Sequence, residues 1–365
     1  MINSNEISVV LQGAFDKRLT LEAIQSIKAF LPKCELILST WEGTRLPSIE
    51  VSKLVLSKDP GFEILDDKYN VKNNVNRQIV STKNGILASS RKYVLKLRSD
   101  VILTSLRFIE EFSKDSVRRC GEYKILKQRV VINNLYCANG RKTKFLFHVS
   151  DWCFFGLRED VLNIFDIPLA PEPMTSRYFE NKPRPKYDPI PSWLFQFIPE
   201  QYIWLSFLNK NFIYPKVSYF CSFSEELLAQ SEKIFANNLI ILNYENFGIK
   251  FKKFCPYKWD YFCQYTHLDW LKMCKKYCDP DLDLSGLREE FKSNARLISN
   301  YSKYRCYLFE AQSCVENKSL RSLLFFVKSM YYLIKFIIKS IGEFFDKDSR
   351  NMNYSNIFLL RILRR

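Results

Sequence analysis

Residues 94–103 read VLKLRSDVIL, and this stretch decides how the first hundred residues are interpreted. Its apolar pattern is that of a buried strand, yet it contains Lys96, Arg98 and Asp100. Burying an unpaired charge costs several kcal/mol, which is comparable to the net stability of a whole domain. The stretch therefore predicts a strand that ends in a carboxylate whose charge is balanced by a partner.

Strand and helix patterns alternate before this stretch. Apolar runs at 7–13, 34–41 and 53–61 predict strands, and apolar residues at helical spacing predict helices at 19–32 and 73–90. Such alternation is typical of a parallel sheet covered by helices. Ligands of these sheets bind beyond the carboxyl ends of the strands.

Polar residues gather at the predicted carboxyl ends of the strands. Each alone is a weak signal, because turns naturally collect glycine, aspartate and serine. Their shared edge is what predicts a binding site. The residues concerned are Gln12, Gly13, Ser39 to Trp41, Asp59, and Arg98 to Asp100.

Asp100 is placed where a divalent cation could bridge a nucleotide diphosphate. Mg²⁺ is commonly held by one or two protein carboxylates, with phosphates and water as the other ligands. The alternative is a structural aspartate that pairs with Arg98 or caps the next turn. The residues alone leave both interpretations open.

Arg77 lies in the first turn of the helix predicted at 73–90, where the helix dipole disfavours a cation. This predicts a neighbouring anion, either a pyrophosphate or a carboxylate, and an exposed surface arginine is the alternative. Asn73, Asn74 and Asn76 could cap the helix, but they are more than one cap requires.

The alternation breaks down after residue 145. Residues 145–160 predict a strand, a turn and a second strand, and the proline-rich residues 168–193 predict an ordered loop at an active or acceptor site. Residues 198–211 predict a helix entered from Pro199, with Glu200 in its first turn.

Asp151 and Glu200 are the candidates for the base that takes a proton from an acceptor hydroxyl. Asp151 could instead be a turn residue, and Glu200 a helix N-terminal charge. His148 could orient Asp151 or bind phosphate, although a satisfied core histidine is the commoner case.

Composition narrows the class of protein. The formal net charge of +16 predicts an anionic partner, and the 2 histidines argue against histidine metal sites and histidine-centred triads. The start of the chain lacks a signal-peptide pattern, which predicts a cytoplasmic protein with reduced thiols. The 11 cysteines are interpreted as small core residues rather than as zinc ligands.

Several of these stretches together resemble the WavE family of lipopolysaccharide-synthesis glycosyltransferases. They follow one another between about residues 7 and 210: VVLQGAF, LPKCELILSTWEG, SKDPG, NNVNRQIVSTKNGI, YVLKLRSDVIL, SDWCFFG and PEQYIW. The resemblance implies a GT-A-like, Rossmann-type mixed sheet flanked by helices, with a helical C-terminal extension. It also implies a nucleotide-sugar donor and a role in bacterial surface polysaccharide synthesis.

The resemblance further implies roles for single residues. Glu200 would match the acidic base of inverting members, and Asp100 the last Asp of the Asp-x-Asp motif that binds Mn²⁺ or Mg²⁺. Arg98 replaces the first Asp of that motif and could itself neutralise phosphate. The expected donor site consists of Gln12, Gly13, Asp59, Asn76, Arg77 and Arg98.

The chain is expected to comprise a glycosyltransferase domain at 1–250, a helical accessory segment at 251–318 and a basic amphipathic tail at 319–365. In the tail, Arg321, Lys328, Lys335 and Lys339 share one helical stripe. Two lysines near its middle argue against a spanning helix. The tail predicts a helix on the cytoplasmic face of the inner membrane, toward anionic head groups, and a buried helix covering the catalytic domain is the alternative.

The predicted function is nucleotide-sugar-dependent, inverting transfer of a hexosyl or related residue. The acceptor would be a lipid-linked or lipid A-core saccharide in lipopolysaccharide or capsule synthesis, and no nucleic-acid partner is expected. A sugar-phosphate transferase or nucleotidyltransferase on a related fold is one alternative. A non-catalytic scaffold docked on membranes is another.

Overall fold

The computed structural model describes residues 2–61, 63–66, 71–183, 195–252, 263–285 and 321–345. The chain divides into two compact units. The first is Met1–Cys255 with Gln264–Leu282, and the second is Pro256–Cys263 with Asp283–Arg365. Among the described residues, the second unit contributes the helix α11, Arg321–Phe345.

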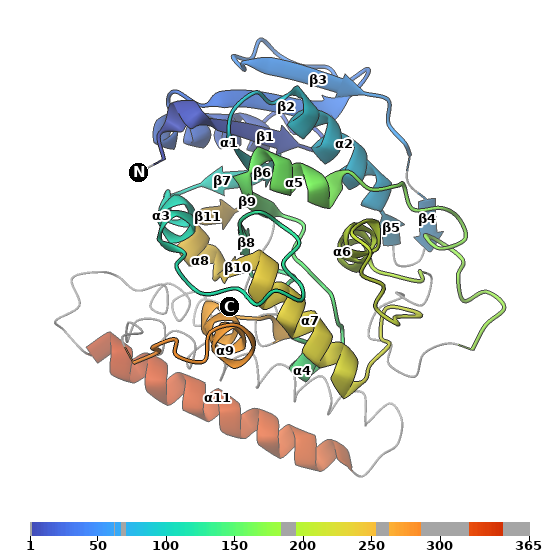
Figure 1. Ribbon diagram of the computed structural model, residues 1–365, viewed down its shortest axis with the longest axis vertical. Helices are drawn as coiled ribbons and strands as arrows, with labels where there is room; N and C mark the ends of the chain where they lie inside the picture. The colour runs from blue at the N-terminus through green and yellow to red at the C-terminus, as the bar shows by residue number, and fades with distance from the viewer. Residues whose placement is uncertain are drawn as a thin grey trace. The chain divides into compact units, whose positions relative to one another are not determined.

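The first unit contains strands and helices that alternate along much of the chain (Figure 1). The strands are β1 Ile7–Gln12, β2 Glu35–Trp41, β3 Lys53–Ser57, β4 Glu63–Asp66, β5 Val71–Asn73, β6 Tyr93–Arg98, β7 Val101–Leu103, β8 Val130–Asn133, β9 Cys153–Leu157, β10 Leu239–Leu242 and β11 Ile249–Phe251. The helices are α1 Leu19–Phe30, α2 Val75–Ala88, α3 Arg107–Lys114, α4 Gly140–Thr143, α5 Arg158–Phe165, α6 Pro199–Lys210, α7 Glu225–Asn238, α8 Tyr244–Phe247 and α9 His267–Tyr277, preceded by a 3₁₀ turn at Ser4–Glu6.

A mixed seven-stranded sheet with the order β10-β8-β9-β6-β1-β2-β3 forms the centre of this unit. β9 runs antiparallel to both of its neighbours, whereas the other neighbouring strands are parallel. Every residue of β1 is buried, as expected for a strand covered on both faces. The prediction of a mixed α/β sheet flanked by helices is therefore confirmed. The finer prediction of a GT-A-like fold stays a prediction.

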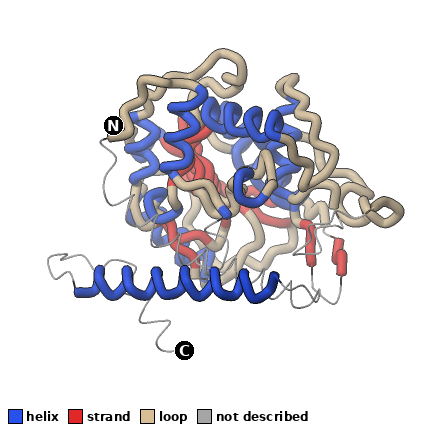
Figure 2. Tube along the Cα trace, turned by 90° about the horizontal axis from the view of Figure 1, so that it is seen from below, coloured by secondary structure: helices blue, strands red, loops and turns tan. Residues whose placement is uncertain are grey.

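Helices cover both faces of the sheet (Figure 2). On one face α2 lies very close to β1, because a Cβ atom on Gly85 would fall only 2.4 Å from Cγ1 of Val10. On the other face Phe108 of α3 packs with its ring centroid 4.8 Å from that of Phe155 and 5.0 Å from that of Phe247. The central strands are therefore buried between helices, whereas the edge strand β3 is partly exposed.

The predicted strands and helices of the first ninety residues are confirmed. The strand predicted through residue 103 is interrupted, because β6 ends at Arg98 and β7 pairs with β11 in a separate two-stranded sheet. The strand predicted at the start of 145–160 is wrong. Lys144 and Phe147 have φ of 63° and 56°, in the left-handed region that a strand does not use.

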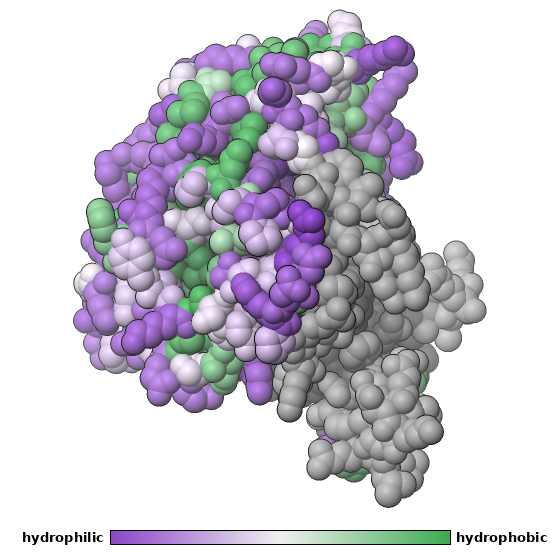
Figure 3. Space-filling model, turned by 90° about the vertical axis from the view of Figure 1, so that its right-hand side faces the viewer, coloured by the Kyte–Doolittle hydropathy of each residue, from purple (hydrophilic) through white to green (hydrophobic). Residues whose placement is uncertain are grey.

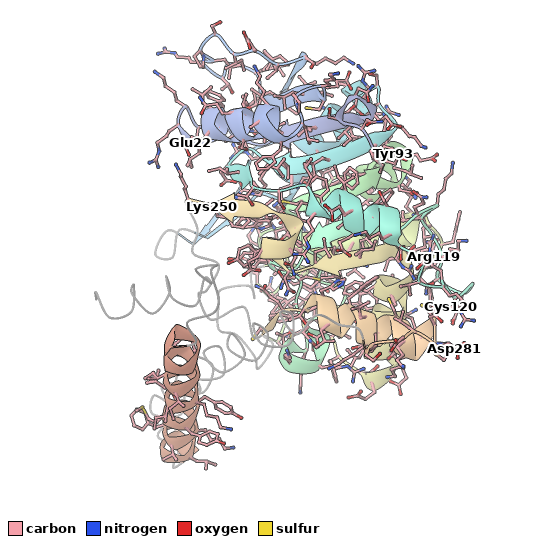
Figure 4. All side chains as sticks on the ribbon, turned by 90° about the vertical axis from the view of Figure 1, so that its left-hand side faces the viewer. Glu22, Tyr93, Arg119, Cys120, Lys250 and Asp281 are labelled. Atoms are coloured by element: carbon pink, nitrogen blue, oxygen red, sulfur yellow. The ribbon has the colours of Figure 1, made fainter. Side chains whose placement is uncertain are left out.

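Arginines hold the segment 115–129, which connects α3 to β8. Arg129 is 1% exposed and pairs with Asp115, while Arg118 pairs with Asp279 and Asp281 beyond α9. Figure 4 shows Cys120 and Asp281 on one side of this unit. These contacts fix where β8 enters the sheet.

Hydrophilic side chains predominate over the described residues visible in Figure 3, with small hydrophobic patches between them. This is consistent with the predicted globular protein whose apolar residues fill a core. Among the described helices, none combines the length and the apolar character that crossing a membrane would require.

Candidate functional site

The carboxyl end of β6 supplies the first two charged groups of the site. Arg98 ends the strand and Asp100 lies in the turn after it. The guanidinium donates from Nε to Oδ1 of Asp100 over 3.1 Å and from Nη2 to Oδ2 over 2.8 Å. Both side chains are part-buried, so Arg98 balances the charge of Asp100 as one predicted alternative required.

The antiparallel direction of β9 brings a second group of side chains to the same edge. Leu97 pairs with Cys153, so the residues that precede β9 lie beside the end of β6. The guanidinium carbon of Arg98 lies 4.1 Å from the ring centroid of Trp152. Because β9 begins where its antiparallel neighbour β6 ends, Asp151 and Trp152 lie beside the end of β6.

Aromatic rings fix the position of Arg98 through Trp152. Tyr136, which follows β8, stacks on Trp152 at 5.7 Å between ring centroids. Phe251 of β11 meets the same indole edge-on at 4.6 Å. Because Trp152 packs against both of these rings, its position is fixed, and the arginine stacked on it has little freedom to move.

Helix α6 supplies Glu200. The helix begins at Pro199, and the amide of the fully buried Gln201 donates to the carbonyl oxygens of Leu146 and Phe220 over 2.8 and 2.9 Å. These bonds anchor the first turn of α6. Glu200 therefore projects from a fixed position, as the predicted helix start implied.

A cavity of about 380 Å³ brings these groups together. Its lining consists of Gln78, Arg98, Asp100, Tyr136, Asp151, Trp152, Glu200 and Phe251. Both predicted base candidates and the Arg98–Asp100 pair therefore share one cavity. The sequence interpretation missed the contributions of Gln78, Tyr136 and Phe251, which no motif marks.

The two carboxyl groups of the cavity influence each other. Burial, and next the negative charge of Asp151, raise the pKa of Glu200 to about 8. Asp151 is 4% exposed, and its Oδ1 has no hydrogen-bond partner among the described residues. A buried carboxylate oxygen without a donor is costly, so this atom is suited to accept a hydrogen bond from a ligand.

Five of the predicted donor-site residues lie at the same sheet edge but do not line the cavity. Gln12 accepts a hydrogen bond from Ser81 Oγ over 2.6 Å, and Gly13, at φ 114°, donates to the carbonyl of Ser39 over 3.1 Å. Glycine suits this turn because side chains rarely adopt that φ.

Asp59, Arg77 and Asn76 make contacts within the protein. Arg77 Nε donates to Oδ1 of Asp59 over 2.7 Å, and this bond is the main reason why the pKa of Asp59 is lowered. The anion predicted beside Arg77 is thus a carboxylate. Asn76 exchanges two hydrogen bonds with the main chain of Ala170, at 3.0 and 2.7 Å, which ties α2 to the proline-rich segment. Donor binding by these residues stays a prediction.

The predicted divalent cation at Asp100 stays a prediction, and Arg98 already occupies part of this carboxylate. Both carboxylate oxygens of Asp100 already accept hydrogen bonds from Arg98. In the part of the chain that the structure describes, no group of three or more His, Cys, Asp or Glu side chains could hold a metal ion. A cation at Asp100 would have to share the carboxylate with a guanidinium.

Comparison with known proteins adds one finding. The family model described as WavE lipopolysaccharide synthesis matches residues 7–305, which is most of the chain. The match extends beyond α6 and includes the segments that carry Tyr136 and Phe251. No curated protein matches the chain.

Proposed function

The chain belongs to the WavE lipopolysaccharide synthesis family, and from this membership we propose that it is a glycosyltransferase that uses a nucleotide-sugar donor. The acceptor would be a lipid-linked or lipid A-core saccharide. Lipopolysaccharide synthesis requires the successive joining of sugars. The cavity contains carboxyl groups that can act as a base and an arginine that can stabilise a leaving diphosphate, and a sugar transfer uses both. The mixed sheet supports a GT-A-like fold for the first unit.

One observation carries this proposal. The cavity at the sheet edge combines Glu200, whose pKa is raised, with an Asp151 oxygen that has no hydrogen-bond partner among the described residues. A base is most effective when its pKa lies near the working pH. A non-catalytic scaffold would have no reason to keep two interacting carboxyl groups at a ligand-sized cavity.

The arrangement supports a single displacement with inversion. The acceptor hydroxyl donates its hydrogen bond to ionised Glu200, and its oxygen attacks the anomeric carbon of the donor, while Oδ1 of Asp151 accepts a hydrogen bond from another hydroxyl of the acceptor. The bond from that carbon to the diphosphate oxygen breaks, and the hydroxyl proton passes to ionised Glu200. The products are a glycoside and a nucleoside diphosphate.

Arg98 is the cavity residue suited to the leaving group. It is held by Asp100 and by the face of Trp152, so it can meet developing negative charge without reorganising. No step requires the predicted Mn²⁺ or Mg²⁺, which remains a proposal. Gln12, Asp59 and Arg77 remain proposed donor contacts on the same edge.

The helix α11 supports a peripheral position on an anionic membrane, as proposed for the cytoplasmic face of the inner membrane. At about 3.6 residues per turn its exposed apolar side chains form one continuous arc. They are Leu324, Phe326, Val327, Met330, Tyr331, Ile334, Ile337 and Ile338. The exposed Lys328 and Lys335 border this arc, which suits a helix that lies in a lipid interface.

Product analysis tests the proposal. Purified protein is incubated with UDP-, GDP- and ADP-sugars and with the lipid A-core fraction of bacterial membranes. We expect one donor to yield a nucleoside diphosphate together with sugar incorporated into the lipid fraction. Release of a nucleoside monophosphate would instead identify a phosphosugar transferase. No binding of any donor would favour the scaffold.

A further inference from the structure

A fully buried lysine lies behind the two carboxyl groups of the cavity. Lys96 occupies the middle of β6 at 0% exposure, and it shares a face of the strand with Arg98 because side chains alternate. Its ammonium donates to the main-chain carbonyl oxygen of Asp151. The rings of Phe154 and Phe165 lie 5.7 and 5.4 Å from Nζ, measured to their centroids.

Comparison with another buried cation shows what is unusual about Lys96. Arg129, at 1% exposure, donates to the carboxylate of Asp115 and to the carbonyl oxygens of three residues, so its hydrogen-bonding capacity is well used. Lys96 has three N–H bonds and, among the described residues, donates one hydrogen bond. Burying a cation with so few hydrogen bonds costs free energy, and an apolar residue at this position of the sheet would avoid that cost.

The charges near Asp151 indicate what this cation does. The charged and titratable groups that act on Asp151 and its neighbours come from β6 and its turn, from β9 and from α6. They are Lys96, Arg98, Asp100, Cys153 and Glu200. Two cations, Lys96 and Arg98, therefore lie among the carboxyl groups of this part of the site.

We propose that Lys96 is a positioning residue of the site: its buried ammonium anchors the main chain of Asp151 at the cavity and places a positive charge beside the two carboxyl groups. Burial lowers the pKa of Lys96 to about 8, and the charge of Asp151 opposes this effect, so the ammonium persists at neutral pH. The chemical role assigned to Asp151 rests on the proposed function, but the charge relationship does not.

Carboxyl ¹³C NMR measures this relationship without any substrate. The signals of Asp151 and Glu200 are assigned from their loss in Asp151→Asn and Glu200→Gln. In Lys96→Met, which is one atom shorter and removes the charge, we expect the main-chain carbonyl signal of Asp151 to shift and Glu200 to titrate about 1 pH unit or more higher. Lys83→Met is the control, because its partner Asp166 keeps Lys210. Titration curves that coincide with those of the unsubstituted protein would overturn the proposal.

A second measurement needs no substitution and covers the case in which Lys96→Met does not fold. In protein labelled with ¹³Cε-lysine, one lysine signal should titrate far below the others, near pH 8, and it should be charged at pH 7. A buried lysine that is neutral at pH 7 would contradict the proposal. Neither experiment uses a substrate, so both can be interpreted even if the protein does not transfer a sugar. The role of Lys96 and the proposed glycosyltransferase activity can therefore be refuted independently.

Discussion

Glu200 is the residue whose protonation controls the chemistry proposed for the cavity. With a pKa of about 8 it is mostly protonated at neutral pH, and it becomes a base as the pH rises. Asp100 has a different position, because its carboxylate fixes Arg98. Substitutions at the two residues should therefore have different effects on donor affinity and turnover.

Glu200→Gln keeps the shape of the side chain but cannot accept a proton. We expect donor affinity to survive while turnover falls by ~10²–10⁴, the usual contribution of a positioned base. Asp100→Asn should instead weaken donor binding, because Arg98 loses its partner. Calorimetric donor affinity and single-turnover rates separate the two results. Equal loss of donor affinity in both variants would make Asp151 the preferred base.

The raised pKa of Glu200 also predicts how stability depends on pH. A raised folded-state pKa means that the folded protein binds more protons than the unfolded chain between the ordinary value of 4.5 and about 8. Stability contributed by protonated Glu200 is fully present below about pH 4.5 and is lost as the pH rises through about 8. Denaturant unfolding from pH 5 to 9 should show this decline in the unsubstituted protein and less of it in Glu200→Gln. Parallel pH profiles would contradict the raised pKa.

At the scale of elements, α11 is the feature with the clearest physical expectation. Each basic residue near an anionic surface contributes about 1 kcal/mol, so Lys328→Glu with Lys335→Glu should weaken binding to phosphatidylglycerol vesicles by about 30-fold or more. Vesicle sedimentation measures the change. Lys142→Glu with Lys216→Glu makes the same change in net charge on the first unit and should have little effect. Equal losses in the two variants would indicate general charge attraction instead.

Local sequence patterns predicted some of the helices and strands and missed others. β1, β2, β3, α1 and α2 were predicted because periodicity and turn residues are local properties of the chain. β8, β10 and α7 were not predicted, and their short apolar runs give little signal before pairing. Among site residues, the strand ends marked Arg98 and Asp100. Tyr136 and Phe251 could not be found, since only the pairing of distant strands brings them to Trp152.

For the whole molecule, the pairing of Arg98 with Asp100 predicts how donor binding responds to metal removal. A donor present at 100 times its Kd raises the free energy of unfolding by about 2.7 kcal/mol. We expect EDTA to leave the resulting increase in Tm unchanged, because an arginine already compensates the charge that a cation would meet. Thermal unfolding with each nucleotide sugar, with EDTA or Mn²⁺, measures this. An increase in Tm that EDTA abolishes and Mn²⁺ restores would show that a cation displaces Arg98.

The order of strands in the sheet has a consequence for the newly made chain. β9 must insert between β6 and β8, and Glu200 and Phe251 come from segments still further along. During synthesis the N-terminal part emerges first, and pairings between distant segments form late. The early strands and α1 can therefore bury a core on the ribosome before any cavity exists. A chain that ends prematurely before α6 has most of its sheet but not Glu200, so the cavity cannot be complete until α6 and β11 have been synthesised.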